Sequence, residues 1–410
     1  MSIARREFLK IVGGATVAGG LAGNAMAVVP KAKAESGFAF ADDQVPMNAA
    51  NLCPMPTSVI TAQNRYAAEL DRSLSTATRR SIEAHKETAR EMVAAMLGVV
   101  ADEVAIVRNT SEANNVIVQG MPLAEGDEVL LWDQNHPSNL VAWQVQAERV
   151  GATVRLFSIP TDMASIDEVV DHFTAILGDR TKVLSFTHIS NVSGFRLPAQ
   201  EICAAIRGRK SDVYIHVDGA QTWGAVDINL SAIDCDSFSG SAHKWFMGPR
   251  EVGILYVRKS RIDSIWPNIV SVPWGRSAND APQGARKFDA FGQRDDAAIA
   301  SLVDAAAYHA DATPAGIEKQ SAAIADYLRE GLQDLGVPFV STANPAFTSS
   351  VIILQATPEN AGRMVEQVFN DAGVQTAAVN GFRMSPHVYN THAHADRVIA
   401  AVKKNRAMLS

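Results

Sequence analysis

Short apolar runs alternate with amphipathic stretches through the middle of this chain. The apolar runs are rich in β-branched residues and lie at 104–107, 129–132, 153–159, 183–188 and 213–218. Helical patterns follow the first four, at 111–119, 138–150, 166–177 and 199–207. Strands that are apolar on both faces are typical of a parallel sheet covered by helices. The pattern therefore predicts an α/β fold with a doubly wound, mostly parallel sheet.

The pattern changes on either side of this region. Serines and threonines within 73–81 interrupt a helical stretch at 64–97, which predicts two helices there. Residues 260–284 hold three prolines and little periodicity, as expected of a long active-site loop. The remaining expected elements are helices at 295–312, 317–335, 360–372 and 395–408 and a strand at 351–354. We expect a large domain over 65–265 and a smaller α+β domain formed by 28–64 and 285–410.

Residues 1–27 have the pattern of an export signal. Paired arginines open the motif at 5–10, an apolar, glycine-rich run follows at 11–23, and small residues flank a cleavage pattern at 25–27. The apolar run is shorter than the ~20 residues that cross a bilayer. The sequence predicts a twin-arginine signal, recognition by the twin-arginine export machinery, cleavage after Ala27 and a periplasmic protein without a lasting membrane anchor.

Charge and cysteine content exclude several classes of function. The 410 residues carry a net charge of −7, and loss of residues 1–27 leaves 34 basic and 43 acidic side chains, or −9. Such an acidic chain argues against a nucleic-acid partner. Cys53, Cys203 and Cys235 lack the number and spacing of a disulfide framework or a metal site. Histidines at 387–394 lack accompanying carboxylates, so we expect no metal.

Lys244 and Asp218 are the first candidates for chemistry. Lys244 lies between a histidine and a tryptophan in a turn of small residues that follows an apolar stretch. Burial and a nearby cation both lower a lysine pKa, which makes the amine a nucleophile. Asp218 ends the apolar run at 213–218. A Schiff-base lysine and an aspartate for a pyridinium nitrogen are expected at a pyridoxal phosphate (PLP) site. A solvated surface lysine is the alternative.

Further polar residues follow other predicted strands, where ligands bind in such sheets. Thr110 and Ser111 open a helix whose free N–H groups suit a phosphate, unless they serve as a plain N-cap. His136 could stack on an aromatic cofactor and Asn191 could donate to a phenolic oxygen, although loop residues of these types are often incidental. Gln221, one helical turn beyond the aspartate, is expected to face the same pocket.

Three ordered motifs resemble the class V aminotransferases, which are fold type I PLP enzymes, and in particular their isopenicillin N epimerase-like branch. They are Thr-His-Ile-Ser-Asn-Val-Ser-Gly at 187–194, His-Val-Asp-Gly-Ala-Gln at 216–221 and Ser-x-His-Lys-x-x-x-Gly-Pro at 241–249. The likeness extends from residue 47 to the C-terminus. It implies PLP as cofactor, a smaller α+β C-terminal domain and a homodimer.

The resemblance also implies a role for each matching residue. Lys244 would form the Schiff base and then act as base, Asp218 would hold the pyridine nitrogen, and His136 would stack on the ring. Gln221 and Asn191 would lie near the phenolic oxygen. The phosphate ligands implied in this way are Ser111, Ser241 and His243.

Two further segments match the family. Arg383 resembles the fork that holds a substrate α-carboxylate, a task that suits a bidentate guanidinium; a structural surface arginine is the alternative. Residues 288–295 resemble the segment that a second subunit inserts toward the phosphate, with Gln293 where relatives have threonine. A site shared in this way implies a twofold dimer.

The lack of a cysteine at one position argues against cysteine desulfuration as the reaction. Desulfurases of this family carry a sulfur-accepting cysteine shortly before the arginine fork, and residues 360–381 contain none. An exported member of the branch is similar to the periplasmic PLP enzyme that tailors the glutamate side chain of pyoverdine-type siderophores, which implies a small-molecule or peptide substrate and the use of oxygen. The alternatives are a racemase like isopenicillin N epimerase, a C–S lyase on a small amino acid, or a non-catalytic binding protein.

Overall fold

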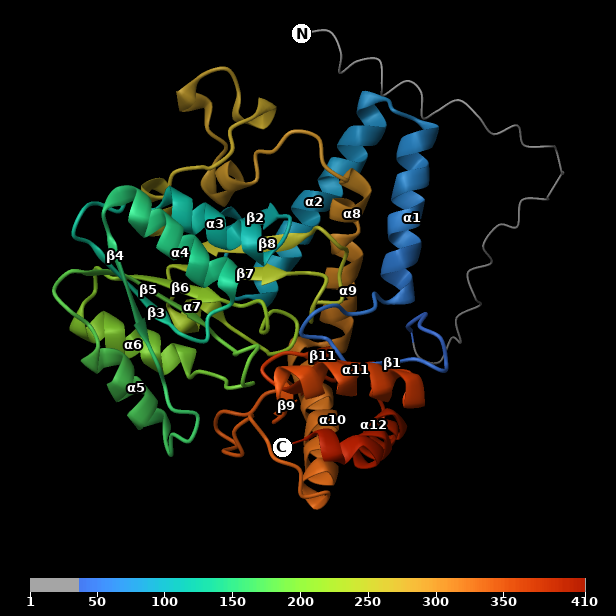
Figure 1. Cartoon of the computed structure of the whole chain (residues 1–410). Helices are drawn as coiled ribbons and strands as arrows, with labels where there is room; N and C mark the ends of the chain where they lie inside the picture. Colours follow the sequence, from blue (N-terminus) through green and yellow to red (C-terminus); the bar gives the residue numbers. More distant parts are fainter. Residues whose placement is uncertain (1–36, 410) are drawn as a thin grey trace, which may run out of the picture.

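A seven-stranded sheet forms the centre of the computed structural model, which describes residues 37–409 (Figure 1). The predicted export signal lies outside these residues. Strand order is β2-β8-β7-β6-β5-β3-β4, and β8 alone pairs antiparallel with its neighbours. The strands are β2 (Val104–Val107), β3 (Glu128–Trp132), β4 (Thr153–Phe157), β5 (Thr181–Thr187), β6 (Tyr214–Asp218), β7 (Ser237–Ser241) and β8 (Gly253–Val257). The mostly parallel α/β sheet predicted from the sequence is confirmed.

Apolar side chains project from both faces of this sheet. Val129 and Leu131 of β3 belong to one apolar cluster, whereas Leu130 and Trp132 of the same strand belong to another. This alternation explains why the strands read as continuous apolar runs, because both faces are covered. The helices of this region are α3 (Thr110–Gly120), α4 (Pro137–Val150), α5 (Ile166–Ala175), α6 (Ala199–Arg209) and α7 (Leu230–Ile233).

Two long helices near the N-terminus pack beside two later ones (Figure 1). The first pair is α1 (Thr57–Arg72) and α2 (Thr76–Met96), and the second is α8 (Asp296–Ala300) and α9 (Leu302–Ala312). The predicted break within 73–81 is confirmed: Ser75 caps α2 by accepting a hydrogen bond from Thr78 N at 3.2 Å. The single helix expected at 295–312 is wrong, because the chain is interrupted at Ser301.

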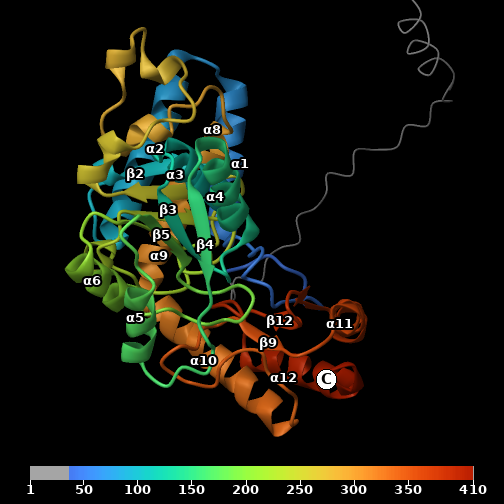
Figure 2. The ribbon, with the colours of Figure 1, turned by 60° about the vertical axis from the view of Figure 1, so that its left-hand side comes forward.

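The C-terminal part forms a separate layer of helices and short strands at one end of the molecule (Figures 1 and 2). Its helices are α10 (Pro314–Asp334), α11 (Pro358–Ala372) and α12 (His392–Asn405). Its strands form an antiparallel sheet of β9 (Ile352–Leu354), β12 (Phe382–Met384) and β11 (Ala377–Ala378) and a parallel pair of β1 (Val45–Pro46) and β10 (Val374–Gln375). The proposed limits of the two domains stay a prediction.

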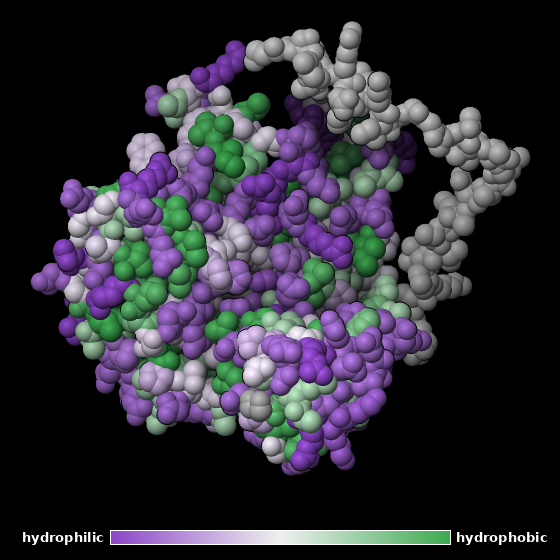
Figure 3. All heavy atoms as spheres, in the orientation of Figure 1, coloured by the Kyte–Doolittle hydropathy of each residue, from purple (hydrophilic) through white to green (hydrophobic). Residues whose placement is uncertain are grey.

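The long loop expected at 260–284 contains only short 3-10 helices. These are η3 (Lys259–Ser264), η4 (Val272–Trp274), η5 (Ala278–Asp280) and η6 (Gly284–Phe288). Two other 3-10 helices, η2 (Ala101–Glu103) and η7 (Arg406–Met408), lie outside this loop. The loop protrudes and carries an exposed apolar group of Trp266, Ile269, Val270 and Val272 (Figure 3). Within 37–409, no helix has the length and apolar character needed to cross a bilayer.

Candidate active site

A cavity of about 270 Å³ opens where several strands of the large sheet end. Asp218 is the last residue of β6, and Lys244 lies in the turn after β7. The structure brings nine of the ten predicted cofactor-binding residues into its wall. These are Thr110, Ser111, His136, Asn191, Asp218, Gln221, Ser241, His243 and Lys244. Their roles as a site stay predictions; the structure shows that these nine residues line one cavity.

The side-chain amine of Lys244 forms no hydrogen bond or ion pair with any of residues 37–409. The backbone around it is fixed, since Met247 N donates to Lys244 O at 2.9 Å and closes the turn. Burial lowers the pKa of Lys244; the carboxylate of Asp218 acts against this shift, and the charge of Arg383 adds to it. A larger share of the amine is therefore neutral near pH 7 than for an ordinary lysine, as a nucleophile or base requires.

Asp218 is a buried carboxylate, 1% exposed, and it forms no ion pair within the described chain. Its two oxygens accept hydrogen bonds from Asn114 Nδ2 at 2.8 Å and from Ala220 N at 3.0 Å. A buried charge that lacks an opposite charge is costly. A protonated pyridine ring in the cavity would supply that charge, so Asp218 fits PLP.

The N-terminus of α3 and two hydroxyl groups form another end of the cavity. Asn109 caps α3 by accepting from Glu112 N at 3.0 Å, and Thr110 N donates to Ser241 Oγ at 2.8 Å. Burial, with the charges of Lys244 and Arg250, lowers the pKa of His243 to about 4, so this imidazole is neutral. Helix N–H groups and hydroxyls therefore suit a phosphate here.

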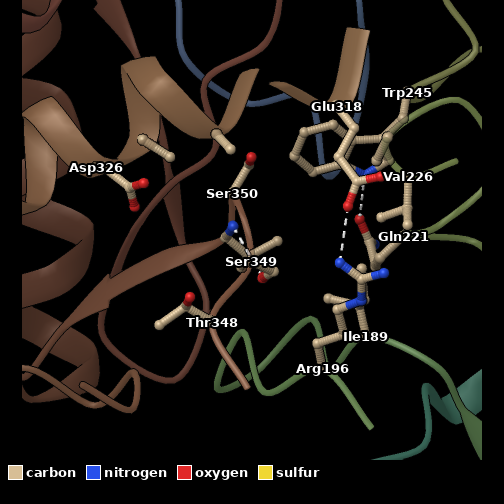
Figure 4. Close-up of a pocket in the computed structure, with 14 residues that line it drawn as sticks. Ile189, Arg196, Gln221, Val226, Trp245, Glu318, Asp326, Thr348, Ser349 and Ser350 are labelled. Atoms are coloured by element: carbon tan, nitrogen blue, oxygen red, sulfur yellow. Dashed lines mark hydrogen bonds and ion pairs between the residues drawn. The ribbon is translucent and has the colours of Figure 1, made fainter. Parts of the chain in front are cut away.

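His136 and Gln221 are both held by hydrogen bonds. His136 caps α4, and its Nδ1 lies 2.8 Å from Ser138 Oγ. Surrounding protein lowers the pKa of His136, and the Lys244 charge adds to this effect, which favours the neutral ring. Gln221 donates to Ala50 O at 3.0 Å. It also accepts from Trp245 Nε1 at 2.7 Å (Figure 4).

The Gln221–Trp245 pair separates two cavities. Gln221 lines the Lys244 cavity, and both residues line a smaller one of about 90 Å³ on the side of α10 (Figure 4). The amide oxygen of Gln221 accepts from the indole, and one amide hydrogen goes to Ala50. Only the second amide hydrogen is thus available for the phenolic oxygen that the resemblance implies.

Arg383 lies within β12, next to the cavity, and is 4% exposed. Its Nη1 donates to Asn191 O at 3.2 Å and its Nη2 to Asn48 Oδ1 at 3.2 Å, whereas its buried Nε has no partner. No carboxylate within 37–409 pairs with it, and burial lowers the pKa of Arg383 to about 10. A buried guanidinium surrounded by neutral acceptors is suited to an anionic ligand.

Gln293 is the predicted cofactor residue that lies elsewhere. It lines a different cavity of about 490 Å³ with residues of α2, including Arg79. Its Nε2 donates to Arg294 O at 3.2 Å and to Asp296 Oδ2 at 3.1 Å. The prediction placed it in the site of a second subunit, and a single chain leaves that prediction open.

Sequence reasoning missed three residues close to the site. Asn48 binds Arg383, Asn114 binds Asp218, and Cys53 lies beside the lysine turn, where its N–H donates to His243 O at 2.8 Å. Burial raises the pKa of Cys53 to about 12, so it is a neutral thiol. These contacts join segments far apart in the chain, so no local pattern could have indicated them.

The histidines considered for a metal are placed separately from one another. His387 is buried between Ser321 Oγ at 2.9 Å and Trp245 O at 2.7 Å, and burial lowers its pKa to about 3. His394 lies in the first turn of α12, where its N–H donates to the capping Thr391 Oγ1 at 3.3 Å. Throughout the described part of the chain, no group of three histidine, cysteine or carboxylate side chains could hold a metal.

Comparison with known proteins agrees with this geometry. The sequence profile of aminotransferase class-V matches residues 49–398. The chain belongs to the class-V aminotransferase family. An isopenicillin N epimerase from Amycolatopsis lactamdurans is 29% identical over 383 residues, which cover 87% of this chain and 94% of that protein. A cysteine desulfurase from Salmonella newport (strain SL254) is 27% identical over 387 residues, with coverage of 86% and 91%.

A solved structure shares the fold of this family member. It is a C-DES variant with glycine covalently linked to its PLP cofactor; it has a TM-score of 0.79 and 22% identity, and covers 88% of this chain and 97% of that chain. The predicted fold type I architecture is therefore confirmed. The family is PLP-dependent, so the prediction of a PLP enzyme is also confirmed.

Proposed function

We propose that this family member is a periplasmic enzyme that acts on an amino group next to a carboxylate, and that its substrate is the glutamate residue of a pyoverdine-type siderophore. The observation that carries the first part is the juxtaposition of Lys244, Asp218 and Arg383. The amine of Lys244, the carboxylate of Asp218 and the guanidinium of Arg383 form no ion pair with any described residue. Together they match the aldehyde carbon and the ring nitrogen of PLP and the carboxylate of a substrate.

PLP, when bound, supplies an electron sink for the carbon next to the substrate amine. The chain's own residues supply binding and proton transfer. Arg383 would hold the substrate carboxylate, and this fixes the orientation of the neighbouring carbon. Lys244, with its lowered pKa, would take or return the proton at that carbon. His136 would cover the cavity with its neutral ring.

The choice of substrate rests on two sequence features. The predicted twin-arginine signal supports export, and export of folded protein suits an enzyme that must bind a cytoplasmic cofactor first. Likeness to the siderophore-tailoring enzymes supports a glutamate side chain as the target. The purified protein with PLP should change the mass of a glutamate-bearing siderophore precursor in air, as read by mass spectrometry. An unchanged precursor would reject this substrate.

An epimerase is the second candidate, because an isopenicillin N epimerase aligns with most of the chain. Such an activity inverts an α-carbon without net oxidation, and Lys244 could serve it equally well. Incubation with candidate amino acids or peptides in D₂O separates the two functions. Deuterium at the α-carbon with inversion, and no oxygen consumption, would favour the epimerase.

We also propose a homodimer. The exposed apolar group on the loop after η3, with Trp266 72% and Val272 88% exposed, suits contact with a second copy. Gln293 lies on the next segment of the chain, residues 288–295. The resemblance implies that this segment reaches the cofactor phosphate of the second subunit. This agreement between an apolar surface and a predicted inserted segment supports the proposal.

A further inference from the structure

A chain of buried hydrogen bonds lies beneath Asp218, and none of the roles above uses it. Ser237 Oγ lies 2.8 Å from His216 Nδ1, and His216 Nε2 lies 3.0 Å from Asn114 Oδ1. Asn114 Nδ2 then donates to Asp218 Oδ2 at 2.8 Å. Ser239 Oγ donates to the same Asn114 Oδ1 at 2.7 Å. All five side chains are 0–1% exposed, so water does not compete for these bonds.

The direction of every bond in this chain follows from chemistry. An ionised carboxylate only accepts, so the amide nitrogen of Asn114 faces Asp218 and its oxygen faces His216. His216 must therefore donate from Nε2 and accept from Ser237 at Nδ1. Burial lowers the pKa of His216 to about 4, which keeps the ring neutral with a single proton. The orientation of Asn114 is thus determined by its neighbours.

Three elements contribute to the network. Asn114 comes from α3, His216 and Asp218 from β6, and the two serines from β7. The N-terminus of α3 also carries Thr110, which binds Ser241 beside the expected phosphate position. One helix therefore contacts both ends of the cavity.

We propose that Asn114, oriented by His216, is a positioning residue that holds the Asp218 carboxylate toward the ring nitrogen of PLP, so that α3 fixes both ends of the cofactor. This inference rests on the PLP site of the proposed function. Donated hydrogen bonds stabilise a carboxylate and fix its orientation. Asn114 and Ala220 N are neutral donors, so the full charge of Asp218 is left for the ring nitrogen.

The test is PLP binding to apoprotein, followed by absorbance and fluorescence. Asn114→Leu removes the donor and nearly preserves volume. We expect its Kd for PLP to rise about 10- to 100-fold, the effect of one hydrogen bond to a charged group. Loss of the donor leaves one carboxylate oxygen of Asp218 without its hydrogen bond, so the carboxylate is no longer held toward the ring nitrogen. The absorbance maximum of the bound PLP, which responds to the partner of its ring nitrogen, should therefore shift relative to the wild type.

Two other variants separate positioning from mere stability. Asn139→Leu replaces another buried asparagine, which accepts from Ser185 Oγ at 3.1 Å and does not contact Asp218. It should lower the Tm as Asn114→Leu does, with the absorbance maximum of bound PLP unchanged. Ser237→Ala, at the far end of the chain of bonds, should weaken PLP binding less than Asn114→Leu.

The outcomes are decisive in each case. An absorbance maximum of bound PLP in Asn114→Leu that equals the wild-type value, or a rise in Kd that equals the rise for Asn139→Leu, would overturn the positioning role. If Asn114→Leu does not fold, Asn114→Ser removes the same amide while admitting water, and the same absorbance test applies to it. Wild-type apoprotein that binds no PLP would instead overturn the proposed function.

Discussion

Arg383 is enclosed by neutral groups, and that makes it a sensitive position for substitution. Its partners are the carbonyl of Asn191 and the amide of Asn48, so the guanidinium charge is free for a ligand. A lysine carries the same charge but cannot bind a carboxylate through two parallel N–H groups. Among single residues, this is the one whose charge most directly requires a substrate anion.

We expect Arg383→Lys to raise the KM for a carboxylate-bearing substrate about 10- to 100-fold. The absorbance of bound PLP should stay unchanged, because Arg383 is not placed at the cofactor. Arg196→Lys is a suitable control, since Arg196 pairs with Glu318 at 2.8 Å outside the Lys244 cavity. Equal effects of the two substitutions on KM would contradict the assignment.

The lowered pKa of Lys244 predicts a pH dependence of stability in the apoprotein. The folded state releases this proton more readily than the unfolded state, so protonated Lys244 opposes folding. The loss of folding free energy caused by protonated Lys244 is fully present below the pKa that Lys244 has in the folded state. It disappears as pH rises toward the ordinary lysine pKa of about 10.4, the value expected in the unfolded state. Wild-type apoprotein should therefore gain stability relative to Lys244→Met over that range, measured by urea denaturation at several pH values. A constant difference would refute the shift.

Local motifs explain which residues the sequence could identify. Asp218 ends a strand, and Lys244 and His136 each lie within four residues of a strand end, so the positions of the strands place them together. Asn114 and Cys53 could not be identified in this way, because their importance depends on which helix or turn packs beside them. Arg383 was found through its resemblance to a family motif, while its burial depends on tertiary packing.

At the scale of elements, the sheet followed from sequence because most of its strands are short apolar runs that contain β-branched residues, as in β2 and β6; β7 contains none. The strands β1, β10, β11 and β12 did not, because each has only two or three residues and forms through pairing with a distant segment. The interruption between α8 and α9 was missed for a related reason: a single serine hardly alters a helical pattern. Tertiary pairing decides such short elements.

The cap of α3 provides a test at this scale. Asn109→Ala removes the side-chain acceptor for Glu112 N and should cost about 1 kcal/mol of stability. Because the same helix end forms part of the cavity, PLP affinity should fall as well. Ser165→Ala removes the cap of α5, where Ser165 accepts from Glu168 N at 3.2 Å away from the cavity. It should lower the Tm similarly without weakening PLP binding.

At the scale of the whole molecule, the segment from β1 to Cys53 contacts both the C-terminal layer and the region of the large sheet. Val45 pairs with Val374 of β10, Ala50 O accepts from Gln221, and Cys53 N donates to His243 O. This segment thus connects the C-terminal layer to the turn that carries the lysine. Movement of the arginine-bearing layer would be transmitted to the cavity along this path.

The protruding loop gives a prediction for assembly. Wild-type protein should be a dimer by light scattering coupled to size-exclusion chromatography. Trp266→Arg combined with Val272→Arg places charges in the exposed apolar group and should shift the protein toward monomer. Leu74→Arg, at a 76% exposed leucine between α1 and α2, is the matched control. A wild-type monomer, or equal dissociation by the control, would argue against this interface.

The hydrogen bond between Trp245 and Gln221 also gives the protein an optical property. Trp245 directly follows Lys244 in the chain, and with Gln221 it separates the Lys244 cavity from the smaller cavity beside α10. Indole emission overlaps the absorption of a lysine-bound pyridoxal group, so energy transfer should quench Trp245 when the cofactor binds. The native fluorescence would then report cofactor loading without any added dye, and Trp245→Phe should reduce the quenching that PLP causes.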